Sequence, residues 1–183
     1  AVVKTKIDRY RDMLRSGRHD SLTGLLNHSA SKEQLEQMLR RTLPVGQLAV
    51  AMIDIDRFKS INDNYGHPVG DQVIRSLAWL LRGRLRNSDL IGRYGGEEFI
   101  VTLGGVDANQ AANLLNRIRE DFSQLPHAHS RGALRASFSC GIAAVPHYLT
   151  GSALIEAADE ALLQAKRDGR NRIVTAGRQR PGA

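Results

Sequence analysis

The chain has 183 residues, of which 42% are hydrophobic, and its formal net charge is +7. This length and apolar content suit one globular domain with a short appendage, and no apolar run approaches the roughly 20 residues of a membrane-spanning helix. The basic surplus favours phosphate-bearing partners, whereas aromatic residues, at 5%, leave little material for stacking single-stranded nucleic acid. The single cysteine, Cys140, excludes an internal disulfide and indicates a reducing compartment, and its apolar neighbours predict a buried thiol.

The first residues predict a helix at the edge of the domain. Val3, Ile7, Tyr10 and Leu14 are spaced four, three and four apart, as on a coiled-coil seam. Two interpretations stay open: the end of a cut stalk, and a loose N-terminal helix that packs on its own domain. We expect a linker helix, the domain itself and a flexible tail over residues 1–19, 20–176 and 177–183.

The rest of the chain alternates between helical and strand periods. After turns over 16–27, the order is helix, strand, helix, hairpin, helix, strand, helix and strand. The expected ranges are 31–43, 47–56, 69–86, 92–103, 107–125, 134–145, 152–169 (with Ser152 as N-cap and Gly169 as stop) and 171–176.

This order predicts an α+β fold with a central mixed, largely antiparallel sheet flanked by helices and an N-terminal stalk helix. The hairpin excludes a doubly wound parallel sheet. We expect the helices to gather on one face of the sheet.

Acidic residues occur at the end of the first strand and at the tip of the hairpin. Asp54 and Asp56 are two apart and therefore project to the same face, where carboxylates hold hard cations such as Mg²⁺ while substrate phosphates complete the shell. If the hairpin tip lies beside this strand end, one of Glu97 and Glu98 joins the metal site and the other points away. Taken singly, each pair is an ordinary solvated acidic group; their joint occurrence favours a metal site.

Two glycines precede these glutamates. Gly95 and Gly96 are expected to form a tight turn with positive φ, and they leave the backbone open to an approaching nucleotide.

The segment between the two acid pairs contains candidate nucleotide contacts. Backbone amides after Asp56 open a helix that suits phosphates, and Lys59 adds a positive charge. Asn62 and Asp71 flank a Gly/Pro turn, and an amide with a carboxylate matches the donor edge of guanine, which adenine lacks. Alternatively, Asn62 is a helix cap and Asp71 a charge at a helix N-terminus.

Four motifs in order, "DSLTGLLN", "DIDRFKSINDNYGHPVGDQVI", "RYGGEEF" and "AKRDGRNR", resemble the GGDEF-domain family of bacterial diguanylate cyclases. The resemblance runs from about Asp20 to Val174 and implies a palm-type, nucleotidyl-cyclase-like fold. It implies an enzyme that condenses two GTP into cyclic di-GMP and two pyrophosphates. Two domains would meet as a homodimer, and the 3'-hydroxyl of each nucleotide would attack the α-phosphate of the other.

The resemblance also implies an upstream sensor or receiver domain and no nucleic-acid partner. The expected location is cytoplasmic, whether or not the full protein is anchored to a membrane.

The resemblance carries site residues over position by position. Two Mg²⁺ or Mn²⁺ ions per site would be bound by Asp54, the Ile55 carbonyl, Glu97 and Glu98. Glu97 and Glu98 are the catalytic candidates, and which of them is the general base stays open. The implied substrate-binding residues are Phe58, Lys59, Asn62, His67, Asp71, Gly95, Gly96, Lys166 and Arg170. Leu163 and His28 depart from the residues usual in the family, but neither departure removes a ligand.

A second site is suggested by Arg86 and Asp89. They form an R-x-x-D placed as in the family's inhibitory site, where cyclic di-GMP acts as an allosteric ligand, and Arg117 could assist. They could also be an exposed i, i+3 ion pair.

Two other classes of function remain. One is a catalytically inactive domain that acts as a receptor for GTP or cyclic di-GMP, and the other is a different palm-type enzyme. The intact acids argue against the first class and the guanine-reading pair against the second. His127 and His129, in a Pro-containing loop, lack a third ligand, so no zinc site is expected.

Overall fold

The computed structural model describes residues 5–15 and 17–177, and its centre is a five-stranded sheet in the order β2-β3-β1-β6-β7. The strands are β1 (Leu48–Ile55), β2 (Leu90–Arg93), β3 (Glu98–Gly104), β6 (Phe138–Ala144) and β7 (Ile173–Thr175). All neighbours pair antiparallel except β6 and β7, which are parallel. The expected mixed, largely antiparallel sheet is therefore confirmed.

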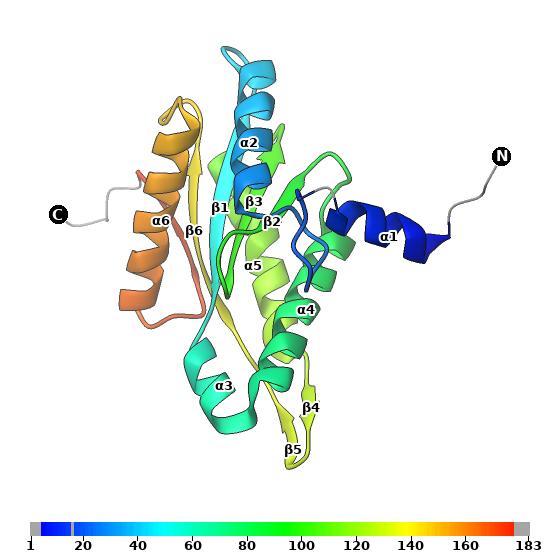
Figure 1. The fold of residues 1–183 in the computed structure, drawn as a ribbon. Coiled ribbons are helices and arrows are strands. Elements are labelled where there is room, and N and C mark those ends of the chain that lie inside the picture. Colours follow the sequence, from blue (N-terminus) through cyan, green and yellow to red (C-terminus); the bar gives the residue numbers. More distant parts are fainter. Residues whose placement is uncertain (1–4, 16, 178–183) are drawn as a thin grey trace.

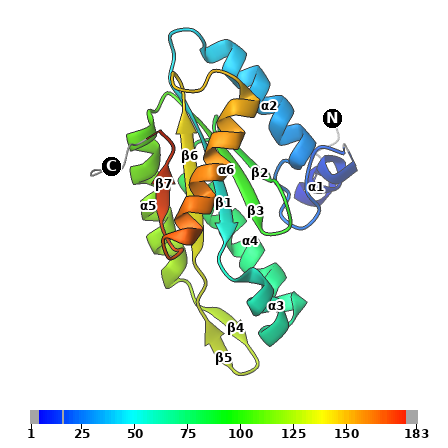
Figure 2. The ribbon, with the colours of Figure 1, turned by 90° about the vertical axis from the view of Figure 1, so that its left-hand side faces the viewer.

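Helices cover both faces of this sheet (Figures 1 and 2). The helices are α1 (Lys6–Arg15), α2 (His28–Thr42), α3 (Phe58–Tyr65), α4 (His67–Arg84), α5 (Ala108–Gln124) and α6 (Gly151–Arg167). One hydrophobic cluster joins α4 and α5 to the sheet, and a second joins α2 and α6 to its other face. The expectation that helices gather on one face was wrong. Every residue of β1 is buried, and a strand buried on both faces needs cover on both.

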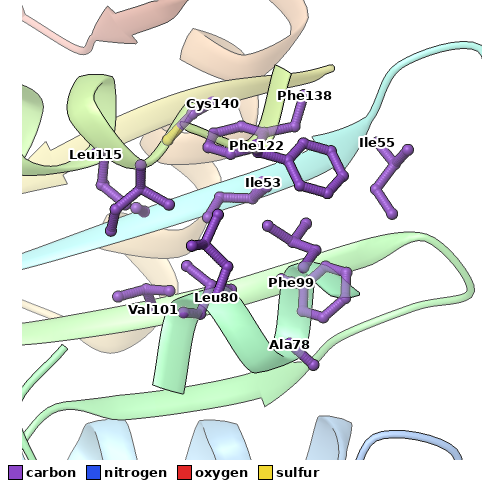
Figure 3. Close-up of a cluster of buried hydrophobic side chains, with 14 of the residues drawn as sticks. Ile53, Ile55, Ala78, Leu80, Phe99, Val101, Leu115, Phe122, Phe138 and Cys140 are labelled. Carbon is purple, nitrogen blue, oxygen red and sulfur yellow. The ribbon is translucent and has the colours of Figure 1, made fainter. Parts of the chain in front are cut away.

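Figure 3 shows part of the larger cluster, in which Ile53, Phe99, Phe122 and Phe138 pack together with no exposed surface. Cys140 lies among them and is fully buried. Burial raises the pKa of this thiol far above its ordinary value. The expected buried thiol is confirmed.

Several element ends differ from the sequence expectation. The helix α2 begins at His28 because Asn27 caps it and accepts a hydrogen bond from the Ala30 amide. The N-cap of α6 is Thr150, whose hydroxyl accepts a hydrogen bond from the Ala153 amide at 3.1 Å, and not Ser152.

A two-stranded ribbon, β4 (His127–His129) and β5 (Gly132–Leu134), replaces the expected loop. Strands of three residues are too short to give an alternating pattern.

Only part of the N-terminal seam can be placed. Ile7 lies on α1 with 64% of its surface exposed. Val3 and the tail after Gly177 lie outside the described residues, as do the side chains of Tyr10 and Leu14. The stalk and the proposed domain boundaries stay predictions. Within residues 5–15 and 17–177, every helix is too short or too polar to cross a bilayer.

Gly141 sets how closely α6 approaches the sheet. A Cβ at this position would lie 2.0 Å from the Ala158 carbonyl oxygen and 2.2 Å from the Leu162 amide nitrogen, both in the backbone of α6. We predict that Gly141→Ala lowers the free energy of unfolding by at least about 2 kcal/mol, measured by urea denaturation.

The matched control is Gly83→Ala on α4, where a Cβ would meet no atom within 4 Å. This variant should be as stable as the parent or more stable by about 0.5 to 1 kcal/mol, because alanine favours the helix. Equal stability of Gly141→Ala and the parent would contradict the close packing of α6.

Candidate functional site

The end of β1 and the tip of the β2–β3 hairpin meet at one point. The antiparallel ladder places Asp54 directly opposite Glu98, and the Ile55 amide donates to the Glu97 carbonyl at 3.2 Å. Directly opposed side chains in such a ladder share one face, with Cβ atoms about 4.5 to 5.5 Å apart. The structure therefore brings Asp54 and the two glutamates together.

This cluster carries more negative charge than its surroundings balance. Burial raises the pKa of Asp54, and Glu97 and Asp56 raise it further, while Lys166 opposes the shift. Burial also raises the pKa of Glu98, and the charges of Asp54 and Asp159 add to the effect. Lys166, in the last turn of α6, forms an ion pair with the Asp54 carboxylate. A further positive charge at this site would therefore be electrostatically favourable.

The donor set fits a divalent cation that a substrate would help to hold. In the described part of the chain, no three acidic, histidine or cysteine side chains converge on one point. However, Mg²⁺ is usually bound by only one or two carboxylates together with substrate phosphates. Asp54 and Glu98 with the Ile55 carbonyl meet that requirement, and their mutual repulsion would be relieved by a cation.

Asp56 has a different role from Asp54. Its carboxylate accepts hydrogen bonds from the hydroxyls of Ser137 and Ser139, at 2.7 and 2.6 Å, and from the Asn171 amide at 3.0 Å. These bonds join the end of β1 to β6 and to the segment before β7. Asp56 thus fixes the strand end and leaves Asp54 as the acid that faces the hairpin. No sequence pattern predicted that the two serines would bind Asp56.

The expected phosphate contacts lie around the start of α3. The N-cap residue, Arg57, has a φ of 54° and gives α3 no side-chain cap, and Lys59 is exposed in the first turn. Arg170, with a φ of 64°, borders a cavity of about 280 Å³ together with Asp56 and Arg57. Strained, non-glycine backbone of this kind is typical of functional sites.

The expected guanine-reading residues lie on two successive helices, Asn62 on α3 and Asp71 on α4. The Oδ1 atom of Asn62 is buried and has no hydrogen-bond partner among the described residues. Gly70 makes room for it, since a Cβ there would lie 1.9 Å from Oδ1 and 3.1 Å from Cζ of Phe58. A buried acceptor without a partner is costly, which favours a ligand donor at this point.

The alternative roles for these two residues were wrong. The N-cap of α4 is Gly66 rather than Asn62, and Asp71 lies beyond the first turn of α4, which contains no acid. His67 is the exposed first residue of this helix.

Arg93 fixes the turn that carries the glutamates. Its Nε and Nη2 atoms donate to the Gly96 carbonyl at 3.0 and 2.8 Å, and Nη1 donates to Asp20 at 3.1 Å. Burial alone would raise the pKa of Asp20, but bonds from Thr23 and the charge of Arg93 bring it below its ordinary value. The segment before α2 is thereby bound to the site, and no sequence pattern assigned this role to Asp20 or Arg93.

The two glycines of this turn differ from the expectation. Gly95 and Gly96 do not adopt a positive φ, so that prediction was wrong. The turn closes instead through the Tyr94 and Gly95 amides, which donate to the Glu98 carbonyl at 2.8 and 3.3 Å. A Cβ at Gly96 would meet no atom within 4 Å, so the backbone there is open to a ligand.

Arg86 and Asp89 form an i, i+3 ion pair, with Nη2 and Oδ1 3.1 Å apart. Arg86 also donates to the Gly104 carbonyl, and both residues border a cavity of about 310 Å³. Arg117 is exposed on α5 and does not line this cavity. Binding of product here stays a prediction.

The chain is also similar to known proteins. Residues 17–172 match the family model described as "Diguanylate cyclase, GGDEF domain". Over 158 residues the chain is 44% identical to diguanylate cyclase DgcP of Pseudomonas aeruginosa, covering 86% of this chain and 24% of that protein. It is 40% identical over 188 residues to the response regulator PleD of Caulobacter vibrioides, covering 95% of this chain and 41% of PleD. The chain thus spans about a quarter and about two fifths of these relatives.

A solved structure is also similar. The crystal structure of the GGDEF domain of DgcB from Caulobacter crescentus, in complex with c-di-GMP, superposes with a TM-score of 0.84. The two sequences are 31% identical, and the match covers 97% of this chain and 98% of that one.

Arg93 provides a test of how the turn is held. We predict that Arg93→Ala speeds hydrogen exchange of the Tyr94 and Gly95 amides about tenfold or more, because the turn loses both bonds to Gly96. In Arg93→Lys these amides should exchange almost as fast as in Arg93→Ala, since an ammonium group lacks the planar guanidinium fork that binds the Gly96 carbonyl.

The control is Arg84→Ala, which removes an exposed ion pair with Asp121 between α4 and α5. Exchange of the turn should stay at the parental rate in this variant. If Arg93→Ala also leaves those amides protected, Arg93 does not hold the turn.

Proposed function

Because the chain belongs to the GGDEF-domain family of diguanylate cyclases, we propose that it condenses two GTP into cyclic di-GMP and two pyrophosphates. The observation that carries the proposal is the register that sets Asp54 opposite Glu98 beside Lys166. Carboxylates at this position suit a metal-assisted attack on a phosphate.

Different residues of the chain bind the metal ions and the phosphates. Asp54, the Ile55 carbonyl, Glu97 and Glu98 would hold two Mg²⁺ or Mn²⁺ ions, which would supply a lower pKa for the attacking 3'-hydroxyl and positive charge beside the leaving group. Lys166 exchanges its ion pair with Asp54 for the triphosphate. The α3 amides, Phe58, Lys59 and Arg170 surround the phosphates, and Gly95 and Gly96 place no side chain in their path; at Gly96 the backbone is open.

The guanine base is bound between α3 and α4, near His67. The unpaired Asn62 Oδ1 accepts a hydrogen bond from the base, and the Asp71 carboxylate accepts from the donors of its edge. Adenine would leave both acceptors unsatisfied, so ATP is rejected.

One domain holds one GTP, so two domains must meet as a homodimer for two phosphodiester bonds to form. In the full protein an upstream sensor or receiver domain governs this pairing in the cytoplasm. The response regulator PleD, similar over 95% of this chain, supports that part of the proposal.

The product also binds at Arg86 and Asp89, with Arg117 supplied by a neighbouring domain, and inhibits the enzyme. The complex of the DgcB domain with c-di-GMP supports product binding within this fold. A receptor without activity is disfavoured by the intact acids at positions 54, 97 and 98.

Chromatography of the products formed from GTP and Mg²⁺ tests the activity. Cyclic di-GMP and pyrophosphate are expected, with no product from ATP. Glu98→Gln should lower turnover at least about a hundredfold and retain GTP binding, because the neutral amide binds the ion more weakly than a carboxylate and does not accept a proton. Glu97→Gln, compared in the same assay, identifies which glutamate is the base.

The matched control is Glu33→Gln, which neutralises an exposed acid on α2 that pairs with Arg18. Its turnover should equal that of the parent. Unchanged turnover in Glu98→Gln would refute the proposed role of Glu98.

Gly70 tests the guanine site without removing a binding group. Gly70→Ala would push the Asn62 amide aside, so we predict about a tenfold rise in the KM for GTP with the fold intact by circular dichroism. Gly83→Ala, on the same helix, should leave KM unchanged. Equal KM in both variants would show that Asn62 does not read the base.

A further inference from the structure

The β4–β5 ribbon extends beyond the end of the sheet and lies beside α3 (Figure 2). Each of its strands has three residues, and two strands of that length are not stable alone. Its position must therefore come from contacts at its base and at its tip.

The base of the ribbon is anchored by His127. This residue is 2% exposed, and its Nε2 atom lies 2.7 Å from the Ser76 hydroxyl on α4. Its ring lies 6.0 Å from the ring of Phe122 on α5. The ribbon is therefore fixed to the two helices that cover one face of the sheet.

The tip of the ribbon holds the last turn of α3. The His129 ring lies 4.5 Å from the ring of Tyr65, and the Arg131 guanidinium lies 5.3 Å from the centre of the same ring. Arg131 Nη2 also donates to the Asn64 carbonyl at 2.6 Å. A cation that binds a carbonyl at the end of a helix also interacts favourably with the helix dipole.

The helix α3 depends on such outside support. It has eight residues, far fewer than an isolated helix needs, and Ile61 is its one buried residue. Its N-cap residue contributes no side-chain hydrogen bond. The turn that the ribbon holds follows Asn62 directly, so movement of that turn would move the Asn62 amide.

We propose that His129 and Arg131 are positioning residues for nucleotide recognition. Acting through Tyr65 and the Asn64 carbonyl, they fix α3 so that Asn62 faces the guanine base, without touching the nucleotide. The inference rests on the proposed function and extends it to residues outside the site.

The test compares Arg131→Ala with the parent in steady-state assays with GTP and with inosine triphosphate, which lacks the exocyclic amine of guanine. Arg131→Ala should raise the KM for GTP about threefold to tenfold and leave kcat within about twofold. The preference for GTP over inosine triphosphate, as a ratio of kcat/KM values, should fall by a similar factor. A role in stability alone would not alter this ratio.

Conservative variants and a matched control sharpen the test. Arg131→Lys should restore part of the loss because it keeps a donor and a cation, and Tyr65→Phe should behave as the parent because it keeps the ring. Arg41→Ala removes another exposed arginine, whose side chain donates to the Gln37 carbonyl of its own helix. It should change neither KM nor the ratio.

Hydrogen exchange of the α3 amides without nucleotide separates this inference from the proposed function. Arg131→Ala should speed exchange over residues 61–65 relative to the parent and to Arg41→Ala. If the parent forms no product from GTP, the proposed function fails. In that case the role of the ribbon also fails if Arg131→Ala leaves the exchange of the α3 amides at the parental rate. If the parent is active and Arg131→Ala keeps the parental KM and ratio, the inference alone is wrong.

Discussion

The site depends on one unfavourable contact, the placement of the Asp54 and Glu98 carboxylates directly across the β1–β3 ladder. Like charges at opposed positions destabilise a sheet. The register is nevertheless fixed, because β1 is buried on both faces and a slip of one residue would turn its apolar side chains to the wrong side. The hydrophobic core therefore supplies the free energy that keeps two acids together.

The neighbouring polar contacts keep this strained arrangement in one geometry. Asp56 uses its carboxylate to bind two serine hydroxyls and the Asn171 amide, so it stabilises the strand end. Arg93 binds the Gly96 carbonyl from the other side. The close approach of α6 at Gly141 brings Lys166 to Asp54. Lys166 balances only part of the charge of the acid pair, and the other contacts leave the rest for a ligand to neutralise.

Much of this arrangement could be predicted from the sequence because it depends on local patterns. The acids at 54, 97 and 98 stand at the ends of periodic segments, so strand pairing alone brings them together. The pairing of Asp20 with Arg93 could not be predicted, since 73 positions separate them and neither stands in a periodic pattern. The same holds for Arg131 and Asn64, which are 67 positions apart. The turn at Gly95 and Gly96 was misjudged because glycine permits a positive φ without requiring it.

The central claim is that Asp54 and the hairpin glutamates bind divalent cations jointly with the phosphates of GTP. It is tested most directly by a crystal structure of the protein with Mn²⁺ and a non-hydrolysable GTP analogue, in which anomalous scattering locates the metal. The account predicts manganese peaks within about 2.0 to 2.3 Å of oxygens from Asp54 and from Glu97 or Glu98, with Lys166 moved to the phosphates. Bound nucleotide with Asp54 still paired to Lys166, and no manganese between the strand end and the hairpin, would contradict it.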